Sequence, residues 1–169
     1  MTSCLRKRNK LQNTDESVLL MKNCQILLEK LITSCNEGET HINDAVVATV
    51  GYIAPEYMIT GDCNEKCDVY SFGILLLELL TRQTVYDPSR SKNGADYWLL
   101  NHAMKFIEDD KFVEVVDPIL LKDKSCPIKE KLLQALTELI LKCVCESAED
   151  RPTMIDVAKQ LRQMYQLSS

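Results

Sequence analysis

The chain has 169 residues and a net charge of −5; 46% of its residues are hydrophobic and 27% are charged. This balance is typical of one globular domain. The acidic charge argues against a nucleic-acid-binding protein, which normally carries a basic face. No apolar run reaches about 18 residues, so the sequence predicts no transmembrane segment. The N-terminal residues also lack the apolar core of a signal peptide.

The cysteines are scattered along the chain and do not form a metal-ligand pattern. Their closest pairs have CxxxC and CxC spacing, and both histidines, His41 and His102, lie far from these pairs in sequence. Because a zinc site usually needs CxxC pairs or a Cys/His cluster, we expect reduced, buried thiols; a redox or zinc site is the alternative. The cysteines are Cys4, Cys24, Cys35, Cys63, Cys67, Cys126, Cys143 and Cys145.

The N-terminus combines Cys4 with a basic stretch from Arg6 to Lys10. A frayed, solvated end is the simpler interpretation, and weak peripheral membrane contact through an acylated Cys4 is the alternative. Myristoylation is not expected, because Thr2 stands where glycine is required. We therefore expect a cytoplasmic protein, with the inner face of the plasma membrane as the alternative location.

The apolar spacing predicts a mostly helical chain. Residues 17–34 carry one amphipathic stripe, whereas residues 67–83 are apolar nearly all round, as in a helix at the centre of a domain. Residues 45–52 are β-branched and favour a strand by propensity alone. Further helices are expected at 95–108, at 128–146 and after the capping box Thr153-x-x-Asp156.

Residues 48–81 resemble the activation segment and the following helix of plant receptor-like kinases. Ala54, Pro55 and Glu56 match the APE motif of that family. Asp68, in the run DVYSFG that ends at Gly73, matches the acid that opens its αF helix. The resemblance continues through FVEVVDPIL and CESAEDRPTMIDVAKQL and covers residues 37–169 in unbroken order. It implies a mostly α fold, an incomplete protein-kinase-like C-lobe that runs from the activation segment through αF to αI.

The same resemblance assigns structural roles to particular residues. Glu56 and Arg151, 95 positions apart, are expected to form the family's buried ion pair. Thr49, Gly51 and Tyr52 fall where the family shapes its substrate-docking loop. Gly51 permits a backbone conformation that other residues resist. Thr49 is expected to keep only a structural role, because the catalytic aspartate that it reaches in the family is absent from this sequence.

Residues 1–36 resemble the leader of plant immune pseudokinases related to the wall-associated kinases. We therefore expect a leader with one amphipathic helix (1–36) followed by a partial protein kinase domain (37–169). In the family the αF helix packs against the catalytic loop, so its apolar surface needs another cover here. The expected cover is the 17–34 helix or a partner protein.

The groups that carry kinase chemistry are not found in this sequence. Phosphoryl transfer needs a glycine-rich loop, an ATP-binding lysine, an HRD catalytic loop and a DFG aspartate. The five glycines are too widely spaced for GxGxxG, and no VAIK lysine, HRD or DFG occurs. The expectation is no catalytic residue, no cofactor and no metal site.

The leading hypothesis is a catalytically inactive, cytosolic adaptor or decoy in plant signalling or immunity. Its protein partner would be an immune receptor, a kinase or a pathogen effector, bound through residues 40–62 and the helix at 95–108. Two alternatives stay open: a fragment or incomplete gene model of an active ATP-dependent serine/threonine receptor-like kinase, and a decayed copy without function. A helix-turn-helix DNA binder is a further alternative, against which the acidic charge counts.

Overall fold

A computed structural model describes residues 50–90, 96–121 and 127–168 of the chain. Within these ranges the fold is helical, and the mostly α architecture expected from the sequence is confirmed. An isolated antiparallel bridge joins Tyr86 to Trp98, and no strand forms among the residues described. The helices are α3 (Pro55–Thr60), α4 (Glu65–Thr81), α5 (Leu99–Glu108), α6 (Pro127–Cys143) and α7 (Met154–Ser168), with short 3₁₀ helices η1 (Phe112–Glu114) and η2 (Ala148–Asp150).

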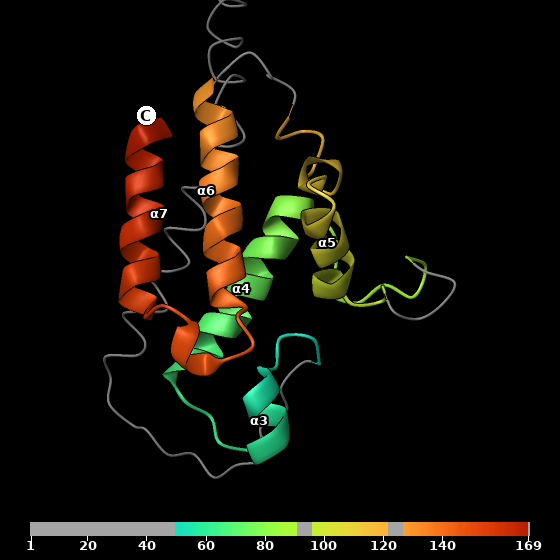
Figure 1. Ribbon diagram of the computed structural model, residues 1–169, viewed down its shortest axis with the longest axis vertical. Helices are drawn as coiled ribbons and strands as arrows, with labels where there is room; N and C mark the ends of the chain where they lie inside the picture. The colour runs from blue at the N-terminus through green and yellow to red at the C-terminus, as the bar shows by residue number, and fades with distance from the viewer. Residues whose placement is uncertain (1–49, 91–95, 122–126, 169) are drawn as a thin grey trace, which may run out of the picture.

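The central element is α4. Its N-terminus is capped by Asn64, whose side chain accepts hydrogen bonds from the backbone N–H groups of Lys66 and Cys67 at 2.8 and 3.2 Å. The helices α6 and α7 lie side by side in opposite directions, and α5 lies on the other side of α6 (Figure 1). Leucines from all four helices form the buried core between them: Leu76, Leu77, Leu80, Leu99, Leu136, Leu139 and Leu161.

Two helices start or end away from their predicted bounds, because backbone groups at these ends form hydrogen bonds outside the helix. The helix predicted from residue 95 begins at Leu99, since the bridge to Tyr86 keeps the preceding residues extended: Asp87 N–H donates to Tyr97 O, and Leu99 N–H to Val85 O. The helix predicted to reach residue 146 ends at Cys143, and the carbonyls that follow it accept hydrogen bonds from Arg151.

Other expectations were wrong or fall outside the described ranges. The short helix α3 was not predicted, and residues 50–52, expected to be extended, form a turn and bend. Residues 17–34 and 45–49 lie outside the ranges that the structure describes, so the division into a 1–36 leader and a 37–169 domain stays a prediction. Within the described ranges, no helix is long and apolar enough to cross a membrane.

The described cysteines are all free thiols, but they differ in burial. Cys67 and Cys143 are buried as expected, whereas Cys63 is exposed because it lies in the polar turn before the N-terminus of α4. No group of three or more His, Cys, Asp or Glu residues able to hold a metal ion occurs in the part of the chain that is described.

A glycine sets the closest approach between α4 and the end of α6. A Cβ atom built on Gly73 would lie 2.7 Å from Cys143 Cβ and 2.8 Å from Val144 Cγ1, both closer than van der Waals contact. The absence of a side chain at Gly73 therefore lets the two elements cross tightly.

We predict that Gly73→Ala lowers the free energy of unfolding by about 1–3 kcal/mol, because the added methyl overpacks the crossing. Urea denaturation measures the change. Gly61→Asn is the matched control: Gly61 has φ +74° with no neighbouring atom within 4 Å of its would-be Cβ, and asparagine tolerates this left-handed conformation. A Gly73→Ala protein as stable as the wild type would contradict the packing argument.

Candidate functional site

The guanidinium of Arg151 joins segments that are distant in sequence. Its Nη1 and Nη2 donate to Glu56 Oε1 and Oε2 at 2.7 and 2.8 Å, forming a bidentate ion pair. The remaining donors reach backbone carbonyls: Nε to Cys145 at 2.7 Å, Nη1 to Lys66 at 3.0 Å and Nη2 to Glu146 at 3.1 Å. All five N–H donors of an arginine are thus used. The predicted pair between Glu56 and Arg151 is therefore present.

Burial makes this pair sensitive to the loss of either charge. The Arg151 side chain has no exposed surface, while that of Glu56 is 22% exposed. The hydrogen bonds from Arg151 lower the pKa of Glu56 from 4.5 to about 2, against the opposing effect of its burial. The thiol of Cys67 also donates to Glu56 Oε1, at 3.4 Å, and burial raises the pKa of this thiol to about 11. Cys67 is therefore a neutral donor near pH 7.

A second contact holds the residues before α3 against α4. The hydroxyl of Tyr52 donates to the carboxylate of Glu78, which also accepts the backbone N–H of Val85 at 2.6 Å. Ser71 Oγ donates to the carbonyl of Tyr52 at 2.7 Å. Burial and the neighbouring Glu78 carboxylate raise the pKa of Tyr52 to about 12. Tyr52 therefore stays protonated and keeps donating at physiological pH.

Gly51 makes that second contact sterically feasible. Its φ of +108° is a conformation that residues with a side chain rarely adopt. A Cβ atom at this position would also lie 2.7 Å from Val85 Cγ2 and 3.0 Å from the Trp98 ring. Both the backbone conformation and the close packing at Gly51 therefore favour a residue without a side chain.

The segment fixed by these two contacts presents an apolar outer surface. The first turn of α3 begins with Pro55 after the buried Ala54, and none of the residues of α3 is buried. Met58 and Ile59 are 69% and 85% exposed on this short helix. We call Met58 and Ile59 the α3 patch.

The other predicted site residues lie apart from this segment. Thr49 falls outside the described residues. Asp68 sits in the first turn of α4, where acidic side chains are favourable, and its carboxylate makes no hydrogen bond within the described part of the chain. Desolvation raises the pKa of Asp68. Gly73 lies a turn and a half further along α4, at the crossing with α6.

Glu78 is the site residue that sequence reasoning missed. It is a charged residue in the second half of a helix that is otherwise apolar, flanked by Leu77 and Leu79. A charge in such a setting needs a partner, because unpaired burial is costly. That requirement was a usable signal, although the identity of the partner, Tyr52, could not be read from the pattern.

Comparison with known proteins places this arrangement in a family. The model of the protein kinase domain matches residues 16–164. The chain belongs to the protein kinase family. From Arabidopsis thaliana, the leucine-rich repeat receptor protein kinase EMS1 is 36% identical over 138 residues, which are 81% of this chain and 11% of EMS1. A second Arabidopsis thaliana relative, named "Probable serine/threonine-protein kinase PBL6", is 41% identical over 125 residues, which are 73% of this chain and 28% of PBL6.

The expected relationship to plant receptor-like kinases is thereby confirmed. The chain spans only 11% of the length of EMS1 and 28% of the length of PBL6. Among solved structures, it is similar to the pseudokinase domain of BIR2, an immune regulator of the RLK/Pelle family, with a TM-score of 0.59 and 23% identity over 74% of this chain and 36% of that one. That similarity supports the fold assignment.

We predict that Glu56→Gln lowers the free energy of unfolding by about 3 kcal/mol, because it leaves the buried Arg151 charge without its counterion. Urea denaturation of the full chain measures the loss. The double variant Glu56→Gln/Arg151→Met is the matched comparison, since it removes the stranded charge along with the pair. A loss in the double variant equal to the sum of the two single losses would show that the charges are not coupled.

The depressed pKa of Glu56 also predicts a pH dependence. Because the folded pKa of about 2 lies below the value of 4.5 in the unfolded chain, the contribution of Glu56 is complete above pH 4.5 and is lost as the pH falls toward 2. We expect Glu56→Gln to flatten the fall in stability across this window relative to the wild type. Thermal melts at a series of pH values test this, and parallel curves for the two proteins would contradict it.

Proposed function

We propose that this kinase-domain chain acts as a protein-binding module and does not itself transfer phosphate. The observation that carries the proposal is the α3 patch. Single exposed apolar side chains are common on protein surfaces and need no explanation. Met58 and Ile59, however, are neighbours on one helix, which the contacts of Glu56 and Tyr52 hold in place. A rigid apolar surface needs little ordering on binding, which favours protein recognition.

The absence of phosphoryl transfer rests on the residues of the sequence. No glycine-rich loop, VAIK lysine, HRD or DFG motif occurs in the 169 residues. Catalysis by kinases is positioning and electrostatic stabilisation by these groups, so their joint loss leaves nothing to hold Mg-ATP or orient the nucleophile. The retained residues, Glu56, Tyr52 and Arg151, position the backbone.

The proposed setting is an adaptor or decoy in plant signalling, in the cytoplasm or at the inner face of the plasma membrane. Its partner would be an immune receptor, a kinase or an effector. The fold shared with the pseudokinase domain of BIR2, described as an immune regulator, supports this setting. A second candidate is a fragment of an active serine/threonine kinase, which is favoured by 36–41% identity to relatives named as kinases. Sequencing the transcript from end to end distinguishes the two.

We predict that millimolar Mg-ATP leaves the melting temperature of the purified chain unchanged, because no group in it binds the nucleotide phosphates. Differential scanning fluorimetry with and without Mg²⁺ measures this. A rise that requires both ATP and Mg²⁺ would overturn the inactive assignment and favour the second candidate.

For the binding role, proximity labelling in plant cells compares the wild type with Met58→Asp/Ile59→Asp. We expect particular proteins to be labelled by the wild type and lost with this variant. The matched control is Val113→Asp/Ile155→Asp, which alters exposed apolar residues on other elements. Equal labelling by all three proteins would contradict a role for the α3 patch.

A further inference from the structure

Two short stretches of the chain carry its net negative charge. Residues 56–68 and 146–151 contain seven acidic residues and two basic ones, a net charge of −5. The whole chain also has a net charge of −5, so the charges of its other residues balance. The α3 patch lies within the first stretch. The exposed acidic residues of the two stretches, which we call the acidic rim, are Asp62, Glu65, Asp68, Glu146, Glu149 and Asp150.

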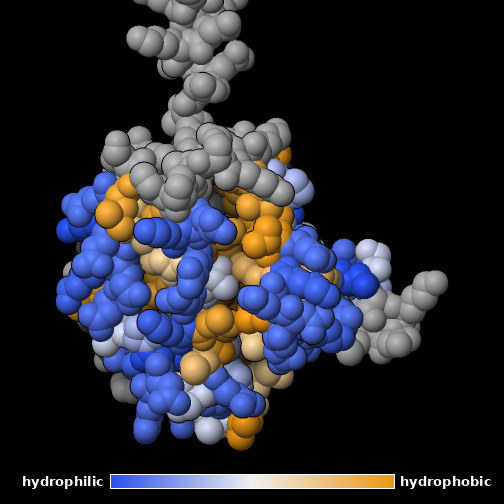
Figure 2. All heavy atoms as spheres, turned by 45° about the horizontal axis from the view of Figure 1, so that its top comes forward, coloured by the Kyte–Doolittle hydropathy of each residue, from blue (hydrophilic) through white to orange (hydrophobic). Residues whose placement is uncertain are grey.

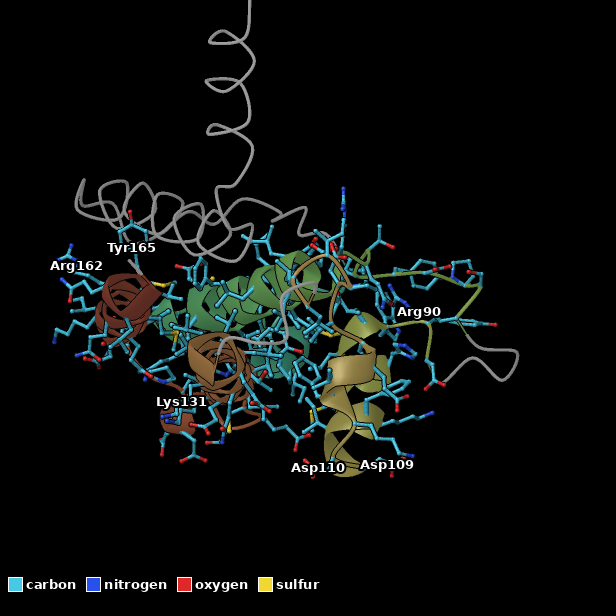
Figure 3. All side chains as sticks on the ribbon, turned by 90° about the horizontal axis from the view of Figure 1, so that it is seen from above. Arg90, Asp109, Asp110, Lys131, Arg162 and Tyr165 are labelled. Atoms are coloured by element: carbon cyan, nitrogen blue, oxygen red, sulfur yellow. The ribbon has the colours of Figure 1, made fainter. Side chains whose placement is uncertain are left out.

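The fold brings these two stretches to the same end of the molecule. Arg151 binds the carboxylate of Glu56 and the backbone carbonyls of Lys66 and Glu146, so α3, the start of α4 and η2 lie together at the lower end in Figure 1. Figure 2 shows apolar atoms bordered by hydrophilic residues at the lower edge of the molecule. The basic side chains of Arg90, Lys131 and Arg162 instead lie at separate places around the other helices (Figure 3).

The two basic residues of these stretches do not neutralise the acidic rim. The side chain of Arg151 has no exposed surface, and its donors are used within the fold. Lys66 Nζ donates to the backbone carbonyls of Arg151 and Pro152. In the described part of the chain, none of the carboxylates of the acidic rim forms an ion pair. These like charges repel one another, and a positively charged partner would relieve the repulsion.

The spacing of the acidic rim indicates which kind of cation it suits. Among the residues that the structure describes, no group of three or more acidic, His or Cys side chains could hold a metal ion. A partner that contacts several of these separate carboxylates must itself carry several separate positive charges, as a segment rich in Lys and Arg does. The adjoining apolar side chains, Met58 and Ile59, require apolar residues in the same segment.

We propose that the α3 patch and the acidic rim together bind a basic segment of a partner protein that also carries apolar side chains. The apolar side chains cover Met58 and Ile59, while the Lys and Arg side chains lie against the acidic rim. Charge complementarity of this kind speeds association, disfavours acidic partners and weakens as salt is added. The inference rests on the proposed binding role of the α3 patch, to which it adds the chemical class of the partner.

Selection of a phage-displayed library of random short peptides on the purified full chain tests this partner class. We expect enriched peptides to combine Lys or Arg with apolar residues and to lose binding to Met58→Ser/Ile59→Ser. Fluorescence anisotropy with synthetic copies should show an affinity about tenfold lower for Asp62→Lys/Glu149→Lys. The matched control is Glu108→Lys/Asp109→Lys, which changes the net charge equally at exposed residues near the end of α5 and should leave the affinity unchanged.

The outcomes separate this inference from the proposed function. Enriched peptides that need Met58 and Ile59 but are acidic or uncharged would overturn the inference and leave the binding role intact. The same holds for peptides that bind Asp62→Lys/Glu149→Lys as tightly as the wild type. If no enriched peptide depends on Met58 and Ile59, the proposed role of the α3 patch fails, and the inference fails with it.

Two other occupants of this surface have distinct signatures. A dimer in sedimentation experiments that Met58→Ser/Ile59→Ser dissociates would show that a second copy of the chain covers the α3 patch. A higher peptide affinity in Arg6→Gln/Lys7→Gln/Arg8→Gln would show that the basic stretch of the chain itself competes for the acidic rim. Either result would overturn the assignment to a separate partner protein.

Urea denaturation without any partner provides a second readout. Because the acidic rim repels itself, Asp62→Lys/Glu149→Lys should raise the urea midpoint above that of the wild type, and added salt should reduce the difference. A lower midpoint would show that these carboxylates have stabilising partners in the folded chain and are not available to a basic segment, which would overturn the inference.

Discussion

The arrangement of the described helices depends on the interactions of one buried group, the guanidinium of Arg151. It binds the carboxylate of Glu56 and three backbone carbonyls, so it ties α3, the start of α4 and the turn after α6 to one point. Lysine, with its compact three-donor head, could not replace this fork. The pair fixes the geometry of the backbone, and neither of its residues is among the groups that transfer phosphate in kinases.

The second contact, between Tyr52 and Glu78, acts on the same segment from the other end of α4. Two anchors at different points define both the position and the orientation of residues 51–60, which one anchor alone would leave free to pivot. In active kinases such rigidity serves the positioning of a substrate. In this chain the same two contacts hold the helix that carries the exposed Met58 and Ile59, so the scaffold and the proposed binding surface share one physical basis.

Sequence reasoning reached the features that leave a periodic or motif-level mark. The central helix was predicted from a run that is apolar on every side, and the distant partners Glu56 and Arg151 followed from the resemblance to receptor-like kinases. The start of α5 depends instead on the bridge between Tyr86 and Trp98, a tertiary contact that local spacing does not encode. The partner of Glu78, Tyr52, was not predicted, because the contact joins residues that are 26 positions apart. The exposure of Cys63 was missed because apolar character was taken as burial, although its neighbours are turn residues.

The attachment of α3 bears on how the molecule opens. None of its residues is fully buried, but Tyr57 and the preceding Ala54 pack with Tyr70, Ile74 and Val144 in a second apolar cluster. Detachment of α3 would expose this cluster and leave the buried Arg151 charge unpaired, so local opening is costly. The closure that Glu56 makes with Arg151 also spans a long stretch of chain, which places it late in folding, after the local pairing of α6 with α7. Residues 51–60 are thus held closed by the same contacts that hold the start of α4 and the turn after α6 together, so loss of Glu56 should loosen all three at once.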